Sequence, residues 1–252
     1  MGAHNNRVNA RATEARTFAF GPGLNIEQAA GTFRRDGHVR LVGFLAEPDG
    51  LRDHLTQRRD WAQVINSGAK VFELDRAMRA AMPPAKADAL DAAVYKGAAA
   101  GFQYRFENIR VPDDEGGREK DATMLTRFAS WMSGGDGRAA LRAICGTQAI
   151  DFADAQATLF SAGDFLTGHD DAVPGKNRHA AYVLGLTPGW RIEWGGMLMF
   201  HDPDGTSVTG MAPGFNTLDL FAVPQMHSVS LVSPAAPFAR LSITGWLRSH
   251  HG

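Results

Sequence analysis

The feature that most constrains the fold is the texture of the chain after about residue 148. From there, short apolar or alternating runs are separated by Gly, Pro and Asp. The runs are 150–152, 155–160, 165–169, 179–186, 195–200, 217–222, 228–232 and 240–247. Short runs at this spacing, broken by turn residues, are typical of antiparallel sandwiches and small barrels. The 28 Gly and 12 Pro residues supply the turns that so many strands need.

The part of the chain before residue 148 is richer in helical patterns. We predict helices over 25–36, 48–58, 74–100 (split at Pro83-Pro84), 122–133 and 137–145, strands over 17–20, 39–43 and 101–110, and a polar loop over 113–121. Residues 1–16 are polar and predict a flexible tail. No Pro/Ser-rich linker divides the rest, so we expect one unit over 17–252, helix-rich over 17–147 and with its β core at 148–248. The expected fold class is mainly β with flanking helices.

Charge and cysteine content exclude several classes of protein. Lys and Arg number 26 and Asp and Glu number 27, which gives a formal net charge of −1. A generic nucleic-acid binder needs a basic surface, so we expect no such partner. No apolar run is long enough to span a bilayer, so we expect no membrane partner. Cys145 is the single cysteine, which rules out a disulfide within the chain and favours a cytoplasmic location.

Two histidines and an aspartate could form a metal site. His169 and Asp171 stand two apart at the end of a predicted strand, so both can point to the same side. His227, at the start of a later strand, would complete a set of two histidines and one carboxylate with open coordination positions. Alone, the His-Asp pair also fits an ordinary surface turn, and a single histidine fits a hydrogen-bonded core residue.

An arginine and a serine in the last strand could bind a carboxylate. A period of two places Arg240, Ser242 and Trp246 on one face of this strand, opposite Leu241 and Ile243. A buried Arg and Ser need a polar partner, and a carboxylate would accept both the guanidinium fork and the hydroxyl. The alternative is an outward-facing Arg240 that pairs with a surface acid.

Several ordered blocks carry a family resemblance. They are Ser161-Ala-Gly-Asp-Phe-Leu-Thr-Gly-His-Asp-Asp171, Arg178-His-Ala-Ala-Tyr-Val-Leu-Gly-Leu-Thr-Pro-Gly-Trp190, Trp194-Gly-Gly-Met-Leu-Met-Phe-His201, Asn216-Thr-Leu-Asp-Leu-Phe221, His227-Ser-Val and Arg240-Leu-Ser-Ile-Thr-Gly-Trp246. Together they resemble the prolyl 4-hydroxylase-like branch of the Fe(II)/2-oxoglutarate-dependent dioxygenases. Within it, they are most similar to the catalytic domain of ribosomal-protein prolyl hydroxylases. The resemblance covers about residues 145–248.

The resemblance implies a fold, a cofactor set and roles for five residues. The fold would be a double-stranded β-helix, or jelly roll. His169, Asp171 and His227 would hold Fe(II), and Arg240 would pair with the distal carboxylate of the cosubstrate 2-oxoglutarate, with Ser242 as a second donor. These residues would form the catalytic site and use O2, with ascorbate as a candidate accessory reductant.

Two positions depart from the family pattern. The position near the start of the Ser161 block, often Tyr in the family, falls at Leu159 or Phe160. Gly185 stands where related prolyl hydroxylases often carry a tyrosine that contacts the same carboxylate. The departure leaves open which group replaces the tyrosine, and a residue without a side chain would leave room for a bulkier ligand.

The implied activity is hydroxylation of a prolyl residue in a protein or peptide, coupled to decarboxylation of 2-oxoglutarate to succinate. The same chemistry on a free amino acid or another small molecule is the first alternative. A non-catalytic barrel that binds a metal or carboxylate ligand is the second. The sequence leaves the oligomeric state open.

Overall fold

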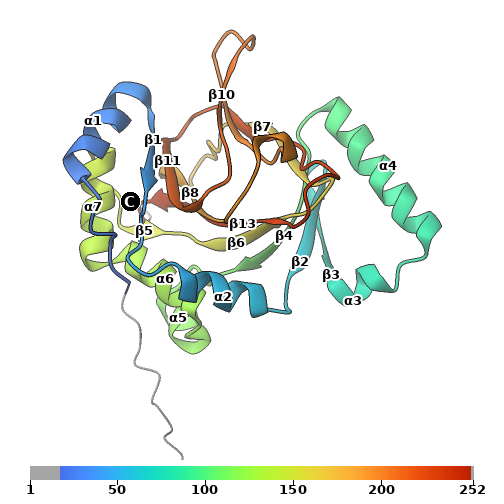
Figure 1. The fold of residues 1–252 in the computed structure, drawn as a ribbon, viewed down its shortest axis with the longest axis horizontal. Helices are drawn as coiled ribbons and strands as arrows, with labels where there is room; N and C mark the ends of the chain where they lie inside the picture. The colour runs from blue at the N-terminus through green and yellow to red at the C-terminus, as the bar shows by residue number, and fades with distance from the viewer. Residues whose placement is uncertain (1–17, 251–252) are drawn as a thin grey trace, which may run out of the picture.

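The computed structural model describes residues 18–250, so the predicted tail over 1–16 lies outside the described residues. Most of the strands form one long antiparallel sheet (Figure 1). The strands are β1 (His38–Val42), β2 (Ala62–Ser67), β3 (Lys70–Asp75), β4 (Tyr104–Arg110), β5 (Phe152–Ala153), β6 (Gln156–Phe160), β7 (Phe165–His169), β8 (Arg178–Leu186), β9 (Leu198–His201), β10 (Val208–Met211), β11 (Phe215–Ala222), β12 (His227–Val229) and β13 (Arg240–Arg248).

The strand order shows how the sheet curls into a jelly roll. It runs β1-β11-β8-β13-β6-β4-β7-β12-β9-β10. Strand β4 joins the two halves, because its residues 107–110 pair with β6 while 104–105 pair with β7. The sheet therefore folds back on itself, and the inner faces of its halves oppose each other (Figure 1). This confirms the expected β core.

Helices cover the outer face of one half of the sheet. The helices are α1 (Ile26–Asp36), α2 (Asp49–Gln57), α3 (Arg76–Ala80), α4 (Pro84–Ala100), α5 (Glu115–Asp121), α6 (Met124–Ser133) and α7 (Gly135–Cys145), with a 3-10 turn at Ile192–Trp194. Apolar residues of α1, α2, α6 and α7 share one buried core with β8, β11 and β13. Between residues 18 and 250, no helix has both the length and the apolar character to cross a membrane.

The last strand follows the predicted alternation. Leu241, Ile243 and Leu247 lie in the core beneath the helices. Arg240 and Trp246 instead line a cavity between the halves of the sheet. Strand β13 therefore presents its polar face to the interior of the barrel, not to solvent.

Two local predictions were wrong, and two features were missed. The expected polar loop over 113–121 contains helix α5, which Asp114 caps by accepting a hydrogen bond from the Gly117 N–H. Residues 17–20 contribute only an isolated bridge at Phe20 within the described part. The hairpin β2–β3 and strand β10 were not predicted, because their short runs mix polar and apolar residues without clear alternation.

Candidate active site

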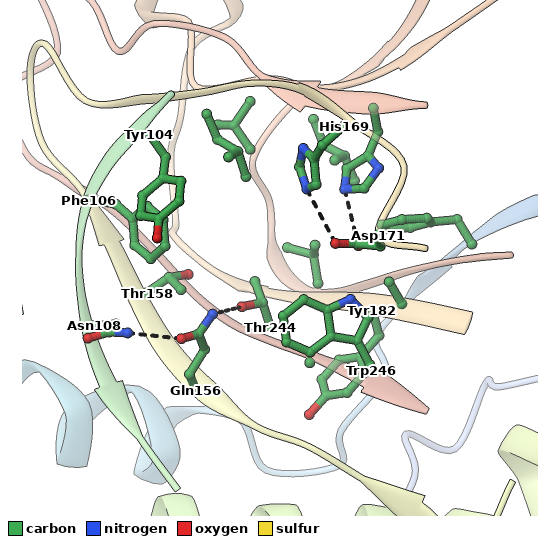
Figure 2. Close-up of a pocket in the computed structure, with 18 of the residues that line it drawn as sticks. Tyr104, Phe106, Asn108, Gln156, Thr158, His169, Asp171, Tyr182, Thr244 and Trp246 are labelled. Atoms are coloured by element: carbon green, nitrogen blue, oxygen red, sulfur yellow. Dashed lines mark hydrogen bonds and ion pairs between the residues drawn. The ribbon is translucent and has the colours of Figure 1, made fainter. Parts of the chain in front are cut away.

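A cavity of about 400 Å³ lies between the two halves of the sheet (Figure 2). His169, Asp171, His227 and Arg240 all line it, so the fold gathers four of the five residues singled out in the sequence. Much of the remaining lining is apolar and aromatic, including Phe160. A concave apolar site with a few convergent polar groups is the usual form of a ligand pocket.

Two histidines and one aspartate converge at one end of this cavity. His169 Nε2 lies 3.4 Å from Asp171 Oδ1, and His227 Nε2 lies 3.5 Å from Asp171 Oδ2. One ligand atom from each residue fits within a span of 4.8 Å. Strands β7 and β12 are paired directly at His169 and His227, which places the two ring centroids 4.2 Å apart.

The local reason for this convergence differs from the predicted one. Strand β7 ends at His169, and Asp171 has a φ of 62°, in the left-handed region. The two side chains meet because the backbone turns sharply after the strand, not because they alternate along it. Asp170 also lines the cavity but is not one of the three converging groups, and its side chain accepts a hydrogen bond from the Ala172 N–H. A residue other than Gly rarely adopts a positive φ without a local reason, which marks Asp171 as a constrained position.

Backbone carbonyls fix how the two imidazole rings face the carboxylate. His169 Nδ1 lies 3.0 Å from the carbonyl oxygen of Thr167, and His227 Nδ1 lies 2.7 Å from that of Gln225. A carbonyl only accepts, so each Nδ1 carries the proton of its hydrogen bond, and each ring turns its Nε2 toward Asp171. This is how metal-binding histidines are commonly oriented.

The electrostatics of the three groups fit a cation. Burial lowers the pKa of His227 to about 4, so its ring is neutral at pH 7. Burial by itself would raise the pKa of Asp171, but the hydrogen bond with His169 and attraction to the rings of His227 and His169 when these are protonated outweigh it and hold that pKa below its ordinary value. The two Nε2 atoms therefore face an ionised carboxylate at 3.4–3.5 Å. That spacing suits two ligands about 2.1 Å from one shared metal ion.

Arg178, stacked on Trp246, holds the backbone of Asp171 in place. The Arg178 guanidinium stacks on the Trp246 ring at 3.6 Å, and its Nη1 donates a 3.0 Å hydrogen bond to the carbonyl oxygen of Asp171. This pair stabilises the turn that carries the carboxylate. Sequence reasoning missed Arg178. Trp246 had a signal, because it shares the inner face of its strand with Arg240.

Arg240 lies deep in the barrel and has an unused hydrogen-bond donor. The residue is 4% exposed, and its Nη1 is buried with no hydrogen-bond partner among the described residues. Burial lowers the pKa of Arg240 to about 10, so the guanidinium stays charged at neutral pH. A buried cation with a free donor is costly unless an anion joins it. The structure therefore places the arginine inside the barrel and excludes the outward-facing alternative.

Within residues 18–250, the one acidic group whose charge acts on Arg240 is Asp219, and its carboxylate is already engaged. Asp219 accepts 2.7 Å hydrogen bonds from both Nε and Nη2 of Arg40. Arg40 also donates to the carbonyl oxygen of Ala212. The bidentate pair leaves the charge of Arg240 available to a ligand.

Ser242 lies beside this site but bonds another side chain. Its Oγ is 2.8 Å from the Thr158 Oγ1, and Thr158 lines the cavity whereas Ser242 does not. Register places Thr158, Ser242, Gly185 and Thr217 in a row across β6, β13, β8 and β11. The Oγ1 of Thr217 is buried without a partner within the described part of the chain.

Gly185 does not leave room for a bulkier ligand, so that expectation was wrong. A Cβ atom at this position would lie 2.5 Å from the carbonyl oxygen of Gly214 and 3.0 Å from Thr217 Oγ1. The backbone of Gly214 already occupies the space that a side chain would need. Glycine is required here because another segment of the main chain approaches so closely.

A polar chain crosses the other end of the cavity. Asn108 Nδ2 donates to Gln156 Oε1 at 2.9 Å, and Gln156 Nε2 donates to Thr244 Oγ1 at 3.4 Å (Figure 2). The three residues come from the neighbouring strands β4, β6 and β13. Tyr104 and Phe106 stand beside them on β4 (Figure 2). Asn108 and Gln156 carried no signal in the sequence, because isolated amides do not indicate a site until the strands are paired.

Comparison with known proteins finds similarity in the C-terminal part of the chain. Residues 155–248 match the model of the 2OG-Fe(II) oxygenase superfamily. A 118-residue stretch is 33% identical to prolyl 3-hydroxylase OGFOD1 of Mus musculus and makes up 44% of this chain. That stretch covers 21% of the mouse protein, so the chain spans about a fifth of this relative's length.

Solved structures support the fold. A prolyl-4-hydroxylase of Pseudomonas putida superposes with a TM-score of 0.54 at 17% identity, covering 90% of this chain and 100% of that one. A prolyl hydroxylase of Trichoplax adhaerens, solved with a peptide fragment of the hypoxia inducible factor oxygen degradation domain, gives 0.57 at 16% identity, covering 89% of each chain. At such low identity the likeness shows a shared fold alone.

Proposed function

We propose that this chain is a 2OG-Fe(II) oxygenase, because residues 155–248 match the model of that superfamily, and that it hydroxylates a prolyl residue of a protein or peptide. His169, Asp171 and His227 are the proposed iron ligands. Arg240 is the proposed partner of the distal carboxylate of 2-oxoglutarate. The prolyl specificity draws on the likeness to prolyl 3-hydroxylase OGFOD1.

The observation that carries the proposal is the unpartnered Nη1 of Arg240 in the same cavity as the three metal-ligand candidates. A structural arginine would have found acceptors for its donors. A dicarboxylate with one end at the iron site and the other at Arg240 would use both features at once. A carboxylate bound by a buried guanidinium is held by charge and by hydrogen bonds of fixed geometry.

The roles of the protein side chains follow from this arrangement. Iron, when bound, supplies the oxidising chemistry, in which O2 and 2-oxoglutarate yield the hydroxylated product, succinate and CO2. The two imidazoles and the carboxylate would occupy one side of the metal and leave the other open to ligands. Arg178 and Trp246 hold Asp171 in its turn, and Arg240 would orient the cosubstrate. The apolar lining excludes water from the reacting centre.

Ser242 is proposed as an indirect second donor, acting through the hydroxyl of Thr158 that lines the cavity. Thr217, whose hydroxyl is unused, is a further candidate for the contact that tyrosine makes in related enzymes. Ascorbate is proposed as an accessory reductant on the family resemblance alone. We also propose a single unit over 17–252, supported by the core that α1 and α2 share with β13. A cytoplasmic location is proposed from the lone, half-buried Cys145.

The experiment is an assay with purified protein, Fe(II) and 2-oxoglutarate, with and without ascorbate. Succinate release and the gain of one oxygen atom are measured on peptides that contain proline and on matched peptides with alanine in its place. We expect oxygen gain on the proline peptides only. Turnover confined to free amino acids or other small molecules would favour the first alternative. Bound iron without succinate release on any substrate would favour the non-catalytic barrel.

A further inference from the structure

A second cavity, of about 740 Å³, lies between helix α4 and the hairpin β2–β3; we call it the α4 groove. Much of its lining is apolar, and Lys86 is the one charged residue in it. Its apolar lining includes Ile65, Phe72, Leu90, Ala93, Val94 and Phe102. The volume is in the range of ligand and peptide pockets.

The walls of the α4 groove expose apolar surface that the fold does not cover. The side chain of Phe72 is 49% exposed and that of Phe102 is 50% exposed. Within residues 18–250, strand β3 pairs only with β2, so its outer edge is free to accept an extended chain. Strand β3 carries Lys70, Glu73 and Asp75, and charges are one way in which natural proteins protect an open edge strand. The exposed aromatic side chains of Phe72 and Phe102 are not protected in this way, and they point to a partner.

The rim between the α4 groove and the iron cavity is rigidly built. Asn66 Nδ2 donates to the carbonyl oxygen of Phe102, and Asn66 Oδ1 accepts from the Tyr104 N–H at 2.7 Å. The buried Gln103 side chain donates to the Asn66 carbonyl oxygen at 2.7 Å, and the Gln103 N–H donates to Thr167 Oγ1. This network holds the Phe102 backbone in place while its ring stays half exposed. Ordered, exposed aromatic rings are typical anchors for a binding partner.

The same ring connects the two cavities. Phe102 lines both the iron cavity and the α4 groove. Its ring centroid is 5.4 Å from that of His169 and 5.6 Å from that of Tyr104. A chain with one residue at the iron site therefore meets the α4 groove directly on passing over Phe102.

We propose that the α4 groove binds an apolar segment of the polypeptide substrate, some residues away from the prolyl residue that enters the iron cavity. This inference rests on the proposed function and narrows it to polypeptides, because a free amino acid bound at the iron site would be too short to extend into the α4 groove. The apolar lining selects segments rich in aliphatic or aromatic side chains. Lys86, as the one charge in the lining, disfavours a basic segment.

The test compares two substitutions on the same helix. Ala93 faces the α4 groove, whereas its neighbour Ala92 is exposed and does not line it. Ala93→Glu places a charge in the groove, and Ala92→Glu places the same charge outside it. Both positions are exposed in a helix, where Glu is nearly as favourable as Ala, so both variants should fold. Neither residue lines the iron cavity.

The probes are synthetic peptides with one fixed proline. One set carries long randomised flanks, and the other carries a single blocked residue on each side. Products that gain one oxygen atom are sequenced by mass spectrometry, and succinate release without peptide reports the intact iron site. We expect wild-type products from the long set to be enriched in apolar residues at a fixed distance from proline. For the best long peptide, we expect Ala93→Glu to raise KM about tenfold, the effect of about 1.4 kcal/mol of lost binding.

Several results would separate this inference from the proposed function. Ala92→Glu should match wild type throughout, and Ala93→Glu should keep its activity on the short set. Equal behaviour of the two variants on long peptides, or no enrichment away from proline, would overturn the groove assignment and leave prolyl hydroxylation standing. Succinate release without hydroxylation of any proline peptide would overturn both. Dimerisation of wild type but not of Ala93→Glu in sedimentation experiments would show instead that a second copy covers the groove.

Discussion

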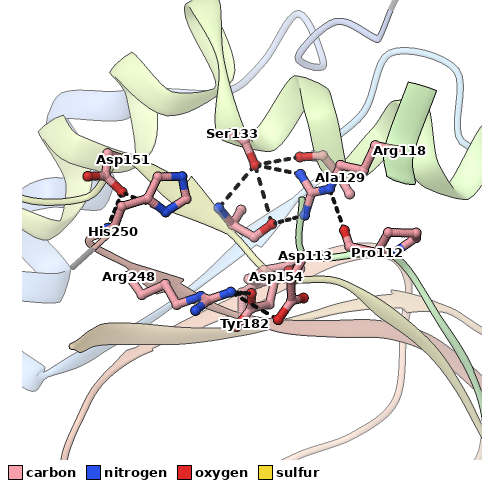
Figure 3. Close-up of polar contacts among 11 residues, drawn as sticks. Pro112, Asp113, Arg118, Ala129, Ser133, Asp151, Asp154, Tyr182, Arg248 and His250 are labelled. Atoms are coloured by element: carbon pink, nitrogen blue, oxygen red, sulfur yellow. Dashed lines mark hydrogen bonds and ion pairs between the residues drawn. The ribbon is translucent and has the colours of Figure 1, made fainter. Parts of the chain in front are cut away.

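Arg118 and Arg240 are both buried in this protein, but their surroundings treat them in opposite ways. Arg118 donates from all three of its nitrogens, to the carbonyl oxygens of Pro112 and Ala153 and to Ser133 Oγ, at 2.8–3.0 Å (Figure 3). Arg240 is 4% exposed, yet its Nη1 has no partner in the part of the chain that the structure describes.

The difference separates a structural cation from one that serves a ligand. Arg118 links α5, α6 and strand β5, and each of its three nitrogens donates a hydrogen bond within the protein. Arg240 lies in a cavity between the two halves of the sheet, so a free donor there has a function only when a ligand enters. Unsatisfied buried groups are rare in native proteins, and each one needs a reason. For Arg240, we propose that the reason is an anionic ligand.

The largest effect is expected at the candidate metal site. Asp171→Ala removes the carboxylate that both histidines face, so iron affinity should fall by more than about a hundredfold and turnover should be lost. Iron content after dialysis and succinate release measure the two effects. The matched control is Asp170→Ala, because the Asp170 side chain accepts a hydrogen bond from the Ala172 N–H and does not face the two histidines. An iron-replete, active Asp171→Ala protein would contradict the assignment of the metal site.

Arg240→Met should lose cosubstrate binding and gain stability in its absence. Removing one partner of a buried charge pair costs about 2–5 kcal/mol of binding, so 2-oxoglutarate affinity should fall by roughly two orders of magnitude or more. Without ligand, the free energy of unfolding of the variant should be about 1–3 kcal/mol higher than that of wild type, because an uncompensated buried charge is gone. Calorimetry with 2-oxoglutarate measures the loss of affinity, and urea unfolding measures the gain in stability. Arg191→Met, at an exposed position, should change neither. Unchanged affinity would mean that Arg240 has another role.

Arg118→Met should show the opposite pattern. It leaves two carbonyl oxygens and the Ser133 hydroxyl without their charged donor, so the free energy of unfolding should fall by about 2–3 kcal/mol. The affinity of the folded fraction for 2-oxoglutarate should not change. Urea unfolding and ligand titration measure these, with Arg127→Met on the exposed face of α6 as control. If both buried arginines gave the same signs, the distinction between them would not hold.

The inner face of the barrel was predictable because it depends on local periodicity. Strand β13 alternates Arg240 and Ser242 with Leu241 and Ile243, and a period of two assigns the faces without knowledge of the strand's neighbours. The three metal-ligand candidates were found in the same way, from short motifs at strand ends. The family resemblance then ordered these motifs into one site.

Features that depend on distant contacts were not predictable. Arg118 lies in a segment that reads as a polar loop, and its burial depends on the Ala153 carbonyl oxygen, 35 residues away. Asp171 reads as a strand residue, and only the backbone shows its positive φ. The sequence predicts open space at Gly185, and only the structure shows that the Gly214 carbonyl oxygen fills it. Each was decided by a contact that sequence spacing does not encode.

The smallest effect concerns the group that keeps Arg240 available. Asp219 and Arg40 are 179 residues apart, and their bidentate pair occupies the carboxylate whose charge acts on Arg240. Arg40→Met would free Asp219 to compete with the ligand. We expect the dissociation constant of 2-oxoglutarate to rise about tenfold, equivalent to about 1.4 kcal/mol, with iron binding unchanged.

A second substitution distinguishes this competition from a general loss of structure. In Arg40→Met/Asp219→Asn, the competing negative charge is gone, so affinity for 2-oxoglutarate should return to within about threefold of wild type even though the ion pair stays broken. A double variant that binds no better than Arg40→Met would show that Arg40 acts through packing of β1 against β11. Recovery would show that Arg240 owes its free charge to a neighbour that occupies Asp219, which is what sets it apart from Arg118.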